Sequence, residues 1–377
     1  MYISVLGAGL VGAPMAEDLA ADPKFNVTVV DRDVAALSRV AARADVAVRE
    51  ADLSRASDIR RAISGADLVV EATPGHMGYA TLKTVIEAGV DVVSISFFPE
   101  DPFELDALAR ERGVVAVVDC GVFPGMGSAL CMDAVRSFDT ARSVEVLVGG
   151  LPEHPTPPLN YRSVFSPSDV IEEYVRPARY LRGGKEVVRP ALSDVERVDW
   201  PGLGELESFN TDGIRTLART LGVPDLREKT LRWPGTAAQM QLLRDVGLFD
   251  ETPCRAGGVD VRPVDVTLPL LAAQWRMPEG EGDVTVLEIR VCGDRSGADQ
   301  EIVWRLVDRW DPESGHHSMA RTTGYTATSV VRAIAEGRYR ETGITPPEFL
   351  GRDPGLTAFL LEELKKRGVM YERSGSA

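Results

Sequence analysis

The chain is poor in the residues from which metal sites and disulfide frameworks are built. Its 377 residues include four histidines and four cysteines, Cys120, Cys131, Cys254 and Cys292. No two cysteines form a Cys-x-x-Cys pair, so we expect reduced thiols and a cytoplasmic location. Because histidine and cysteine ligands are so scarce, we expect no metal site. The four histidines also leave few residues from which a Ser/His/Asp triad could be built.

Positive charge and long apolar runs are also lacking. The formal net charge is −15 and no basic patch offsets it, which argues against nucleic acid as a partner. No run approaches the ~20 apolar residues of a membrane span, so we expect no membrane partner. The first residues are typical of a strand rather than a signal peptide. A content of 44% hydrophobic and 26% charged residues is that of a globular protein, here long enough for two domains.

Up to about residue 125, short β-branched runs alternate with stretches typical of amphipathic helices. The predicted strands are 2–6, 26–31, 46–52, 67–73, 91–97 and 114–119. The predicted helices are 14–21, 34–42, 57–63, 79–88 and 102–112. Strands that are apolar on both faces belong to parallel sheets covered by helices. The pattern therefore predicts an α/β fold with a Rossmann-type, doubly wound parallel sheet.

After residue 125 the alternation is lost and proline and glycine become dense. Residues 284–293 and 300–310 predict a long antiparallel hairpin, joined by the polar turn 294–299. Further helices are predicted at 326–336 and 356–367, and the tail 373–377 is expected to be disordered. This half of the chain indicates a second domain of α+β type.

A Gly-x-Gly-x-x-Gly loop lies between the first strand and the first helix, the context that a dinucleotide site requires. Gly7 permits the tight turn, Gly9 lets the backbone approach a pyrophosphate, and Gly12 lets the helix pack on the strand. The backbone of Leu10 and Val11 completes the phosphate-binding helix end.

The end of the second strand indicates which dinucleotide binds. Asp31 follows Gly12 by 19 residues and is placed to accept hydrogen bonds from the adenosine ribose. A 2′-phosphate would meet its carboxylate, so we predict NAD, with NADP possible because Arg32 follows directly.

Other cofactor contacts are predicted where later strands end, because ligands of open parallel sheets lie at the carboxyl ends of the strands. Asp52 and Leu53 are candidates for the adenine edge, although Asp52 is as readily explained as a helix cap. Candidates nearer the nicotinamide, at the ends of the fourth and fifth strands, are Ala72, Thr73, Pro74 and Ser96, with Phe97 beside them toward the substrate.

Four further segments resemble the saccharopine dehydrogenase family, and within it lysine 6-dehydrogenase. They are DCGVFPGM (119–126), the region 160–185, TLRWPG (230–235) and MARTTGYTA (319–327). The resemblance implies a Rossmann domain over 1–124, a central substrate and dimerisation domain over 125–318, and a segment, 319–377, that packs back on the first domain. It also implies a homodimer and hydride transfer at a C–N bond of an amino-acid-like amine.

The sequence departs from the family pattern at three positions. Saccharopine reductases carry Asp at the position of Phe123 and Arg near Thr211, and lysine 6-dehydrogenases carry His at the position of Thr236. The resemblance therefore implies the family and the reaction type, but not one substrate.

Candidates for proton transfer are few. Asp119 ends the sixth predicted strand, Glu71 precedes the loop after the fourth, and His76 is the one histidine near the cofactor. Two of them have a structural alternative: a cap at the domain crossover for Asp119, and a solvent-facing loop position for His76.

For the substrate carboxylate we favour Arg232, because guanidinium binds carboxylate with two parallel hydrogen bonds, although an ion pair on a strand fits as well. Tyr161 and Thr211 fall where the resemblance places the substrate pocket, and Phe123 is a candidate for its apolar wall.

The glycine loop predicts a dinucleotide site, and the resemblance implies an NAD(P)-dependent dehydrogenase acting on CH–NH or CH–NH2 groups of a small-molecule amine or amino acid. Two alternatives stay open. One is a reductase that condenses an amine with an aldehyde, as in carboxynorspermidine formation. The other is a non-catalytic NAD-binding protein.

Overall fold

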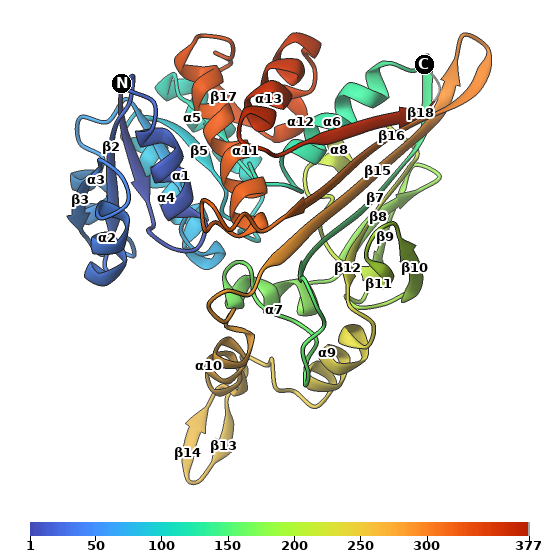
Figure 1. Cartoon of the computed structure of the whole chain (residues 1–377), viewed down its shortest axis with the longest axis horizontal. Coiled ribbons are helices and arrows are strands. Elements are labelled where there is room, and N and C mark those ends of the chain that lie inside the picture. Colours follow the sequence, from blue (N-terminus) through green and yellow to red (C-terminus); the bar gives the residue numbers. More distant parts are fainter. Residues whose placement is uncertain (376–377) are drawn as a thin grey trace. The chain divides into compact units, whose positions relative to one another are not determined.

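The computed structural model describes residues 1–375, which divide into two compact units (Figure 1). Unit 1 contains Met1–Arg136 and Met319–Met370, and unit 2 contains Ser137–Ser318 and residues 371–375. The division differs from the predicted boundaries at both ends. Residues 125–136 stay with unit 1, and residues 371–375 join unit 2 rather than the nucleotide-binding unit.

Unit 1 is built on a seven-stranded sheet in the order β17-β6-β5-β4-β1-β2-β3. All of its pairings are parallel. The strands are β1 (Tyr2–Leu6), β2 (Asn26–Asp31), β3 (Ala47–Glu50), β4 (Leu68–Glu71), β5 (Asp91–Ser94), β6 (Val115–Val117) and β17 (Gly343–Thr345). Because β1 lies between β2 and β4, the strand order reverses there, and α/β sheets bind ligands at such a switch point. The predicted fold class is confirmed, with β17 as an added strand.

Helices connect these strands. They are α1 (Gly12–Ala20), α2 (Val34–Ala41), α3 (Ala56–Ala62), α4 (Gly75–Glu87), the 3₁₀ helix η1 (Pro102–Leu105), α5 (Asp106–Arg112) and α6 (Met126–Arg136). Asp33 caps α2 by accepting from the backbone N–H groups of Ala35 and Ala36. Gly113 ends α5 in the left-handed region, at φ 68°, a conformation that glycine adopts readily at helix C-termini.

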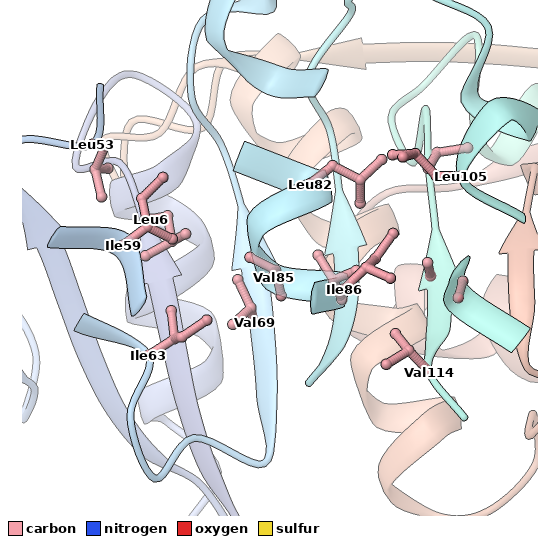
Figure 2. Packing of buried hydrophobic residues seen from close by; sticks show 14 of the residues in the cluster. Leu6, Leu53, Ile59, Ile63, Val69, Leu82, Val85, Ile86, Leu105 and Val114 are labelled. Atoms are coloured by element: carbon pink, nitrogen blue, oxygen red, sulfur yellow. The ribbon is translucent and has the colours of Figure 1, made fainter. Parts of the chain in front are cut away.

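The core of unit 1 lies between one face of the sheet and its helices (Figure 2). Leu6 on β1 and Val69 on β4 are fully buried and belong to one cluster with Leu82, Val85 and Ile86 of α4. Such strands read as continuous apolar runs because both of their faces are covered.

The C-terminal part of unit 1 contains α11 (Ser318–Ala335), α12 (Pro347–Leu350) and α13 (Pro354–Lys366). Helices α12 and α13 both pack on α6, which keeps residues 126–136 in this unit. Helix α11 begins eight residues before its predicted start at Thr326. Its first turns are rich in Ser, Thr and Gly, which are weak helix formers, so the sequence pattern hides them.

Unit 2 is built on a nine-stranded mixed sheet, in which β7 and β12 pair in parallel and the other pairings are antiparallel. Its strands are β7 (Thr140–Pro152), β8 (Ala178–Arg182), β9 (Lys185–Arg189), β10 (Glu196–Trp200), β11 (Gly204–Asn210), β12 (Asp225–Arg232), β15 (Asp283–Arg295), β16 (Ala298–Arg309) and β18 (Tyr371–Gly375). The predicted long hairpin is confirmed as β15–β16. Its turn residues Ser296 and Gly297 both have positive φ, as tight hairpin turns need.

The expected disorder of the tail is wrong for residues 373–375, because they pair with β16 as part of β18. Residues 376 and 377 lie outside the described part of the chain. The short polar tail carries little strand signal of its own, and the backbone of β16 supplies its hydrogen-bond partners.

The remaining elements of unit 2 are α7 (Pro167–Val175), α8 (Leu217–Thr220), α9 (Thr236–Asp245), α10 (Pro263–Trp275) and a separate hairpin of β13 (Cys254–Ala256) and β14 (Val259–Val261). Helices α7, α9 and α10 share one buried cluster that includes Tyr174, Met240 and Trp275. None of the helices in residues 1–375 is long and apolar enough to span a membrane.

Candidate functional site

The glycine loop has the geometry that a dinucleotide requires. Gly7 has φ +110°, and a Cβ there would lie 2.6 Å from the carbonyl oxygen of Ala72. A Cβ on Gly12 would lie 2.1 Å from the carbonyl oxygen of Gly7. Both positions therefore need glycine for packing within the protein.

Gly9 differs from its two neighbours in the loop. A Cβ built on Gly9 would meet no other atom of the described chain within 4 Å, so the backbone there faces open space. Just beyond it, α1 begins after Val11, whose side chain makes no capping hydrogen bond. An open backbone next to an uncapped helix start fits the pyrophosphate of a dinucleotide.

Asp31 lies at the end of β2, directly beside this loop. One of its carboxylate oxygens accepts from the backbone N–H of Ala8 at 2.7 Å, and the other accepts from that of Asp33 at 2.9 Å. These bonds fix the carboxylate at the glycine loop, where the ribose of a bound dinucleotide is expected. Arg32 is exposed.

The two residues predicted at the adenine edge differ in role. Asp52 accepts from the backbone N–H and the hydroxyl of Ser54, which lower its pKa, and pairs with Arg55 at 3.2 Å. Leu53 is buried in the core of unit 1. The turn formed by Asp52 precedes α3, but the N-cap of that helix is Arg55, so Asp52 is a turn residue rather than the helix cap considered from the sequence.

Glu71 is the centre of a buried polar cluster where β4 and β5 end. It is fully buried and accepts from the backbone N–H of Thr73 at 2.9 Å and from the hydroxyl of Ser96 at 2.7 Å. The hydroxyls of Thr73 and Ser94 donate to it as well. Burial raises the pKa of Glu71, and these hydrogen bonds oppose the rise.

These contacts give Glu71 a positioning role in the loops that follow β4 and β5. Because four donors surround its carboxylate, it holds Thr73 and Ser96 in place rather than facing an open space. Beyond it, Ala72 is partly buried and Pro74 is exposed.

Asp119 lies at the start of the turn that follows β6. It is buried and has φ 50°, a left-handed conformation that Asp adopts more readily than most residues. The next residue, Cys120, donates its backbone N–H to the carbonyl of Ser94 at 2.9 Å, which fastens the turn to the end of β5. Phe123 follows in the same turn and is partly buried. Non-glycine residues held in this conformation often lie at functional sites.

Helix α11 contacts both the glycine loop helix and this turn within unit 1. A Cβ on Gly324 would lie 2.9 Å from the Cγ of Met15 and 3.5 Å from a methyl carbon of Val11. A Cβ on Gly121 would lie 3.3 Å from a side-chain carbon of Thr323. The segment 319–327, part of the family resemblance, therefore supports the backbone of the cofactor site.

The candidates Tyr161 and Arg232 meet in the interior of unit 2. The guanidinium of Arg232 lies 4.9 Å from the ring centre of Tyr161 and donates to Glu173 at 2.7 Å. Both side chains are almost fully buried, and burial raises the pKa of Glu173. The alternative of an ion pair on a strand thus describes the contacts of Arg232. The hydroxyl of Tyr161 has no hydrogen-bond partner among the described residues.

Thr211 belongs to a second buried cluster in unit 2, around Glu228 on β12. Its hydroxyl lies 2.9 Å from both carboxyl oxygens of Glu228 and 2.8 Å from the hydroxyl of Thr230. Burial raises the pKa of Glu228 to about 8, against the hydrogen bonds from Thr211 and Gly213 that lower it. The sequence analysis did not single out Glu228. Its period-two spacing from Leu226 and Thr230 along β12 could have placed it on their buried face.

The structure brings the predicted residues together in two separate sets. The cofactor candidates, Asp119 and Phe97 belong to unit 1, whereas Tyr161, Thr211 and Arg232 belong to unit 2. His76 is exposed in the first turn of α4. Among the described residues, no three or more His, Cys, Asp or Glu side chains gather as metal ligands would.

Two family models match the chain. One, described as the saccharopine dehydrogenase NADP binding domain, matches residues 3–117, and the other, described as the saccharopine dehydrogenase C-terminal domain, matches residues 121–369. Together they cover both sets of candidate residues.

Curated relatives and a solved structure agree with these matches. The mitochondrial alpha-aminoadipic semialdehyde synthase of Mus musculus is 27% identical over 98% of this chain, which covers 47% of that protein. The saccharopine dehydrogenase [NADP(+), L-glutamate-forming] of Schizosaccharomyces pombe is 25% identical over 98% of both chains. The apo saccharopine dehydrogenase (L-Glu forming) of Saccharomyces cerevisiae matches the fold over the full length of both chains, with a TM-score of 0.81 and 19% identity. The chain spans about half or less of the length of the mammalian relatives that it matches.

Proposed function

Because the chain belongs to the saccharopine dehydrogenase family of NAD(P)-dependent oxidoreductases, we propose that it oxidises, or in reverse forms, a C–N bond of an amino-acid-like amine. The observation that carries this proposal is the glycine loop: Gly9 faces open space beside a fixed Asp31, at the switch point of a parallel sheet. The family match does not favour either alternative, the condensing reductase or the non-catalytic protein.

We propose NAD as the preferred cofactor. The Asp31 carboxylate is held at the glycine loop by two backbone N–H groups, where it suits ribose hydroxyls and repels a 2′-phosphate. This departs from the matched family model and from the Schizosaccharomyces pombe relative, whose descriptions name NADP. Arg32 is the neighbouring group that would favour NADP instead.

When bound, the nicotinamide supplies the acceptor for a hydride from the substrate carbon. The residues of this chain would bind the cofactor, hold the surrounding loops and accept the proton. The backbone of residues 9–12 holds the phosphates, and Glu71 keeps the loops after β4 and β5 in place through Thr73 and Ser96. We assign proton acceptance from the substrate nitrogen to Asp119, because it is buried in a turn fastened to β5. Loss of one proton and one hydride from the C–N unit leaves an imine, which water converts to a carbonyl compound and an amine.

Substrate contacts are proposed for each unit by itself. Phe97 and Phe123 would supply apolar surface, and Tyr161 and Thr211 would supply hydroxyl groups. Arg232 would bind a carboxylate only by sharing its guanidinium with Glu173. If Arg232 is such an anchor, Arg232→Gln raises KM for the amino acid in the folded fraction, in addition to the loss of stability expected from breaking its buried pair with Glu173. A large loss of stability with unchanged KM in the folded fraction would assign it to the ion pair alone.

Cofactor reduction with a panel of amines tests the proposed reaction. The purified chain is mixed with NAD+ or NADP+ and with lysine, ornithine, saccharopine or a diamine, and reduced nicotinamide is followed by absorbance. We expect reduction with at least one amino acid that carries a secondary or ω-amino group. Binding of NADH by fluorescence without reduction by any of these amines would overturn the dehydrogenase and favour a non-catalytic NAD-binding protein.

A small-molecule amine as the partner and a cytoplasmic location also stand as proposals. All four thiols are free, as a reducing compartment would keep them. Fluorescence microscopy of the tagged full chain in its own host would test the location.

A further inference from the structure

His317 and Asp283 form a hydrogen-bonded pair in unit 2, apart from the residues already assigned to the site. The Nδ1 atom of His317 lies 3.2 Å from a carboxylate oxygen of Asp283. Asp283 is completely buried at the start of β15, whereas the side chain of His317 is 27% exposed. A buried carboxylate that holds a partly exposed imidazole is an arrangement by which enzymes orient a histidine for proton transfer.

The backbone around Asp283 fixes its carboxylate. The oxygen that faces His317 also accepts from the backbone N–H of Ser318 at 2.6 Å. The carbonyl of Asp283 accepts from the N–H of Trp310 at 2.8 Å, and the hydroxyl of Ser318 accepts from the N–H of Thr285 at 3.2 Å. Because these bonds join β15 to the end of β16 and to the first residue of α11, the carboxylate is held at a fixed place beside the imidazole.

Trp310 restrains the ring of His317 from another side. The two rings stack with their centres 6.4 Å apart and an angle of 30° between their planes. The indole lies close to the strand that carries Asp283, because a Cβ built on Gly282 would lie 3.0 Å from two carbon atoms of Trp310. A larger residue at position 282 would displace the indole. The imidazole is therefore oriented by an ion-pair partner and by an aromatic neighbour together.

The tautomer of His317 follows from its pairing with Asp283. A carboxylate only accepts hydrogen bonds, so Nδ1 carries the proton that faces Asp283, and Nε2 of the neutral ring keeps a lone pair. Within the described part of the chain, Nε2 of His317 has no hydrogen-bond partner. The pair thus presents one basic nitrogen, on a partly exposed side chain, to water or to a ligand.

The proposed reaction needs a second proton-transfer group besides Asp119. Hydrolysis of the imine takes protons from water and delivers them to the departing nitrogen, and histidine is the side chain that both accepts and donates a proton near neutral pH. His317 directly precedes α11, the helix that supports the cofactor site. Within unit 1, Thr323 of α11 lies against Gly121, two residues after Asp119.

We propose that His317, oriented by Asp283, activates water for hydrolysis of the imine; this inference rests on the proposed oxidation of a C–N bond. Water bonds to the imine carbon while Nε2 takes one of its protons, which then passes to the imine nitrogen. The hydroxyl proton of the adduct follows the same route through Nε2, the C–N bond breaks, and a carbonyl compound and an amine leave. His317 ends in its starting form, and Asp283 acts as a positioning residue.

Stopped-flow absorbance of reduced nicotinamide separates hydride transfer from hydrolysis. The amide of His317→Asn can still donate to Asp283, but the basic nitrogen is lost. We expect its first turnover to keep the wild-type rate and its steady-state kcat to fall by about 10²–10⁴, which leaves a burst of one reduced nicotinamide per active site. The control is His154→Asn, at an exposed histidine of the same unit, which should behave as wild type. Circular dichroism and NADH fluorescence report folding and cofactor affinity, and His317→Gln decides if His317→Asn does not fold.

The outcomes separate the role of His317 from the proposed reaction. If the wild-type protein gives no first-turnover reduction with any amine of the panel, the reaction is overturned and this inference with it. If folded His317→Asn keeps the wild-type steady-state kcat, the reaction stands and the role of His317 is overturned. A fall in first-turnover rate or NADH affinity as large as the fall in kcat would also overturn that role, because His317 would then only maintain the structure.

Discussion

Asp18 and Arg332 form a nearly buried ion pair although 314 residues separate them in the sequence. The distance between the Asp18 carboxylate and the Arg332 guanidinium is 2.8 Å. Arg367 donates to the same carboxylate at 2.6 Å, and the carbonyl of Asp18 accepts a further bond from Arg332 at 2.9 Å. Asp18 lies on α1, the helix that starts at the glycine loop, so the C-terminal helices α11 and α13 hold the cofactor-binding helix in place.

Asp18→Asn should therefore destabilise unit 1. It leaves Arg332 and Arg367 buried with one fewer negative charge, and breaking a buried ion pair typically costs about 3–5 kcal/mol. Urea unfolding followed by circular dichroism measures the loss, and NADH fluorescence measures any fall in cofactor affinity. The control is Glu17→Gln on the same helix, whose partner Arg43 is 48% exposed, and which should cost less than about 1 kcal/mol. Equal losses of stability in the two variants would contradict the role of Asp18 in holding α1 to α11 and α13.

The sequence predicted most of unit 1 because its signals are local. Most of its strands are largely apolar runs, and Asp33 and Gly113 mark helix ends within a few residues. The strand β17 has three residues and the start of α11 is rich in Ser and Thr, so neither has a local signal. Their positions depend on contacts with segments more than 200 residues away, such as the bond from the N–H of Ile344 to Asp106.

The sequence likewise predicted some parts of the candidate site and did not reveal others. The glycine loop and Asp31 follow from spacing alone, because one loop and one strand end determine them. The sequence made Glu71 a candidate base only because it precedes the loop after the fourth predicted strand. Its hydrogen bond with Ser94 exists because the register of β4 and β5 sets these two residues side by side, and a register is not readable from one sequence.

Substitution of Gly9 and of Gly12 by Ala should affect different properties: cofactor affinity for Gly9 and stability for Gly12. The Cβ of Gly9→Ala enters open space in the free protein, so stability stays near wild type while NADH affinity falls at least about tenfold, or ~1.4 kcal/mol. The Cβ of Gly12→Ala would lie 2.1 Å from the Gly7 carbonyl oxygen, and overpacking of this kind costs about 1–3 kcal/mol of stability. Thermal melts with NADH titrations measure both. If Gly9→Ala binds NADH normally, the phosphates do not lie against that position.

Asp31→Ser should shift cofactor preference toward NADP. Removing the carboxylate removes the repulsion of a 2′-phosphate and leaves Arg32 free to approach it, so we expect the ratio of kcat/KM for NAD to that for NADP to fall at least about tenfold. Asp33→Asn is the matched control, because it keeps the cap of α2 and removes one nearby charge. An unchanged ratio in Asp31→Ser, or an equal fall in the control, would remove the argument for NAD.

Asp119→Asn tests the assigned proton acceptor. Asn tolerates the left-handed conformation found at Asp119, so the turn should be kept while the basic group is lost. We expect kcat to fall by about 10²–10⁴ with the NADH dissociation constant unchanged. Asp101→Asn, which retains the cap at η1, is the control and should keep full activity. A wild-type kcat in Asp119→Asn would move the proton-accepting role to another group.

Glu228 should make the protein less stable as pH rises. Burial raises its pKa in the folded chain from 4.5 to about 8, so below pH 4.5 both folded and unfolded states hold the proton. Between these two values only the folded state keeps the proton. The free energy of unfolding should then fall by as much as about 1.4 kcal/mol per pH unit, until the folded state also ionises near pH 8.

Glu228→Gln removes this titration and keeps an acceptor for the N–H of Gly213, which now bonds Glu228 at 3.0 Å. Urea unfolding of both proteins from pH 5 to pH 9 measures the difference. We expect the variant to gain stability relative to wild type as pH rises, with most of the gain reached by pH 8. Glu205→Gln, at the exposed start of the neighbouring strand β11, should run parallel to wild type over the whole range. A constant difference in stability between Glu228→Gln and wild type from pH 5 to pH 9 would contradict this prediction, because it would mean that Glu228 is already ionised at pH 5. The Thr211 hydroxyl would then donate its hydrogen bond to a carboxylate rather than to a protonated acid.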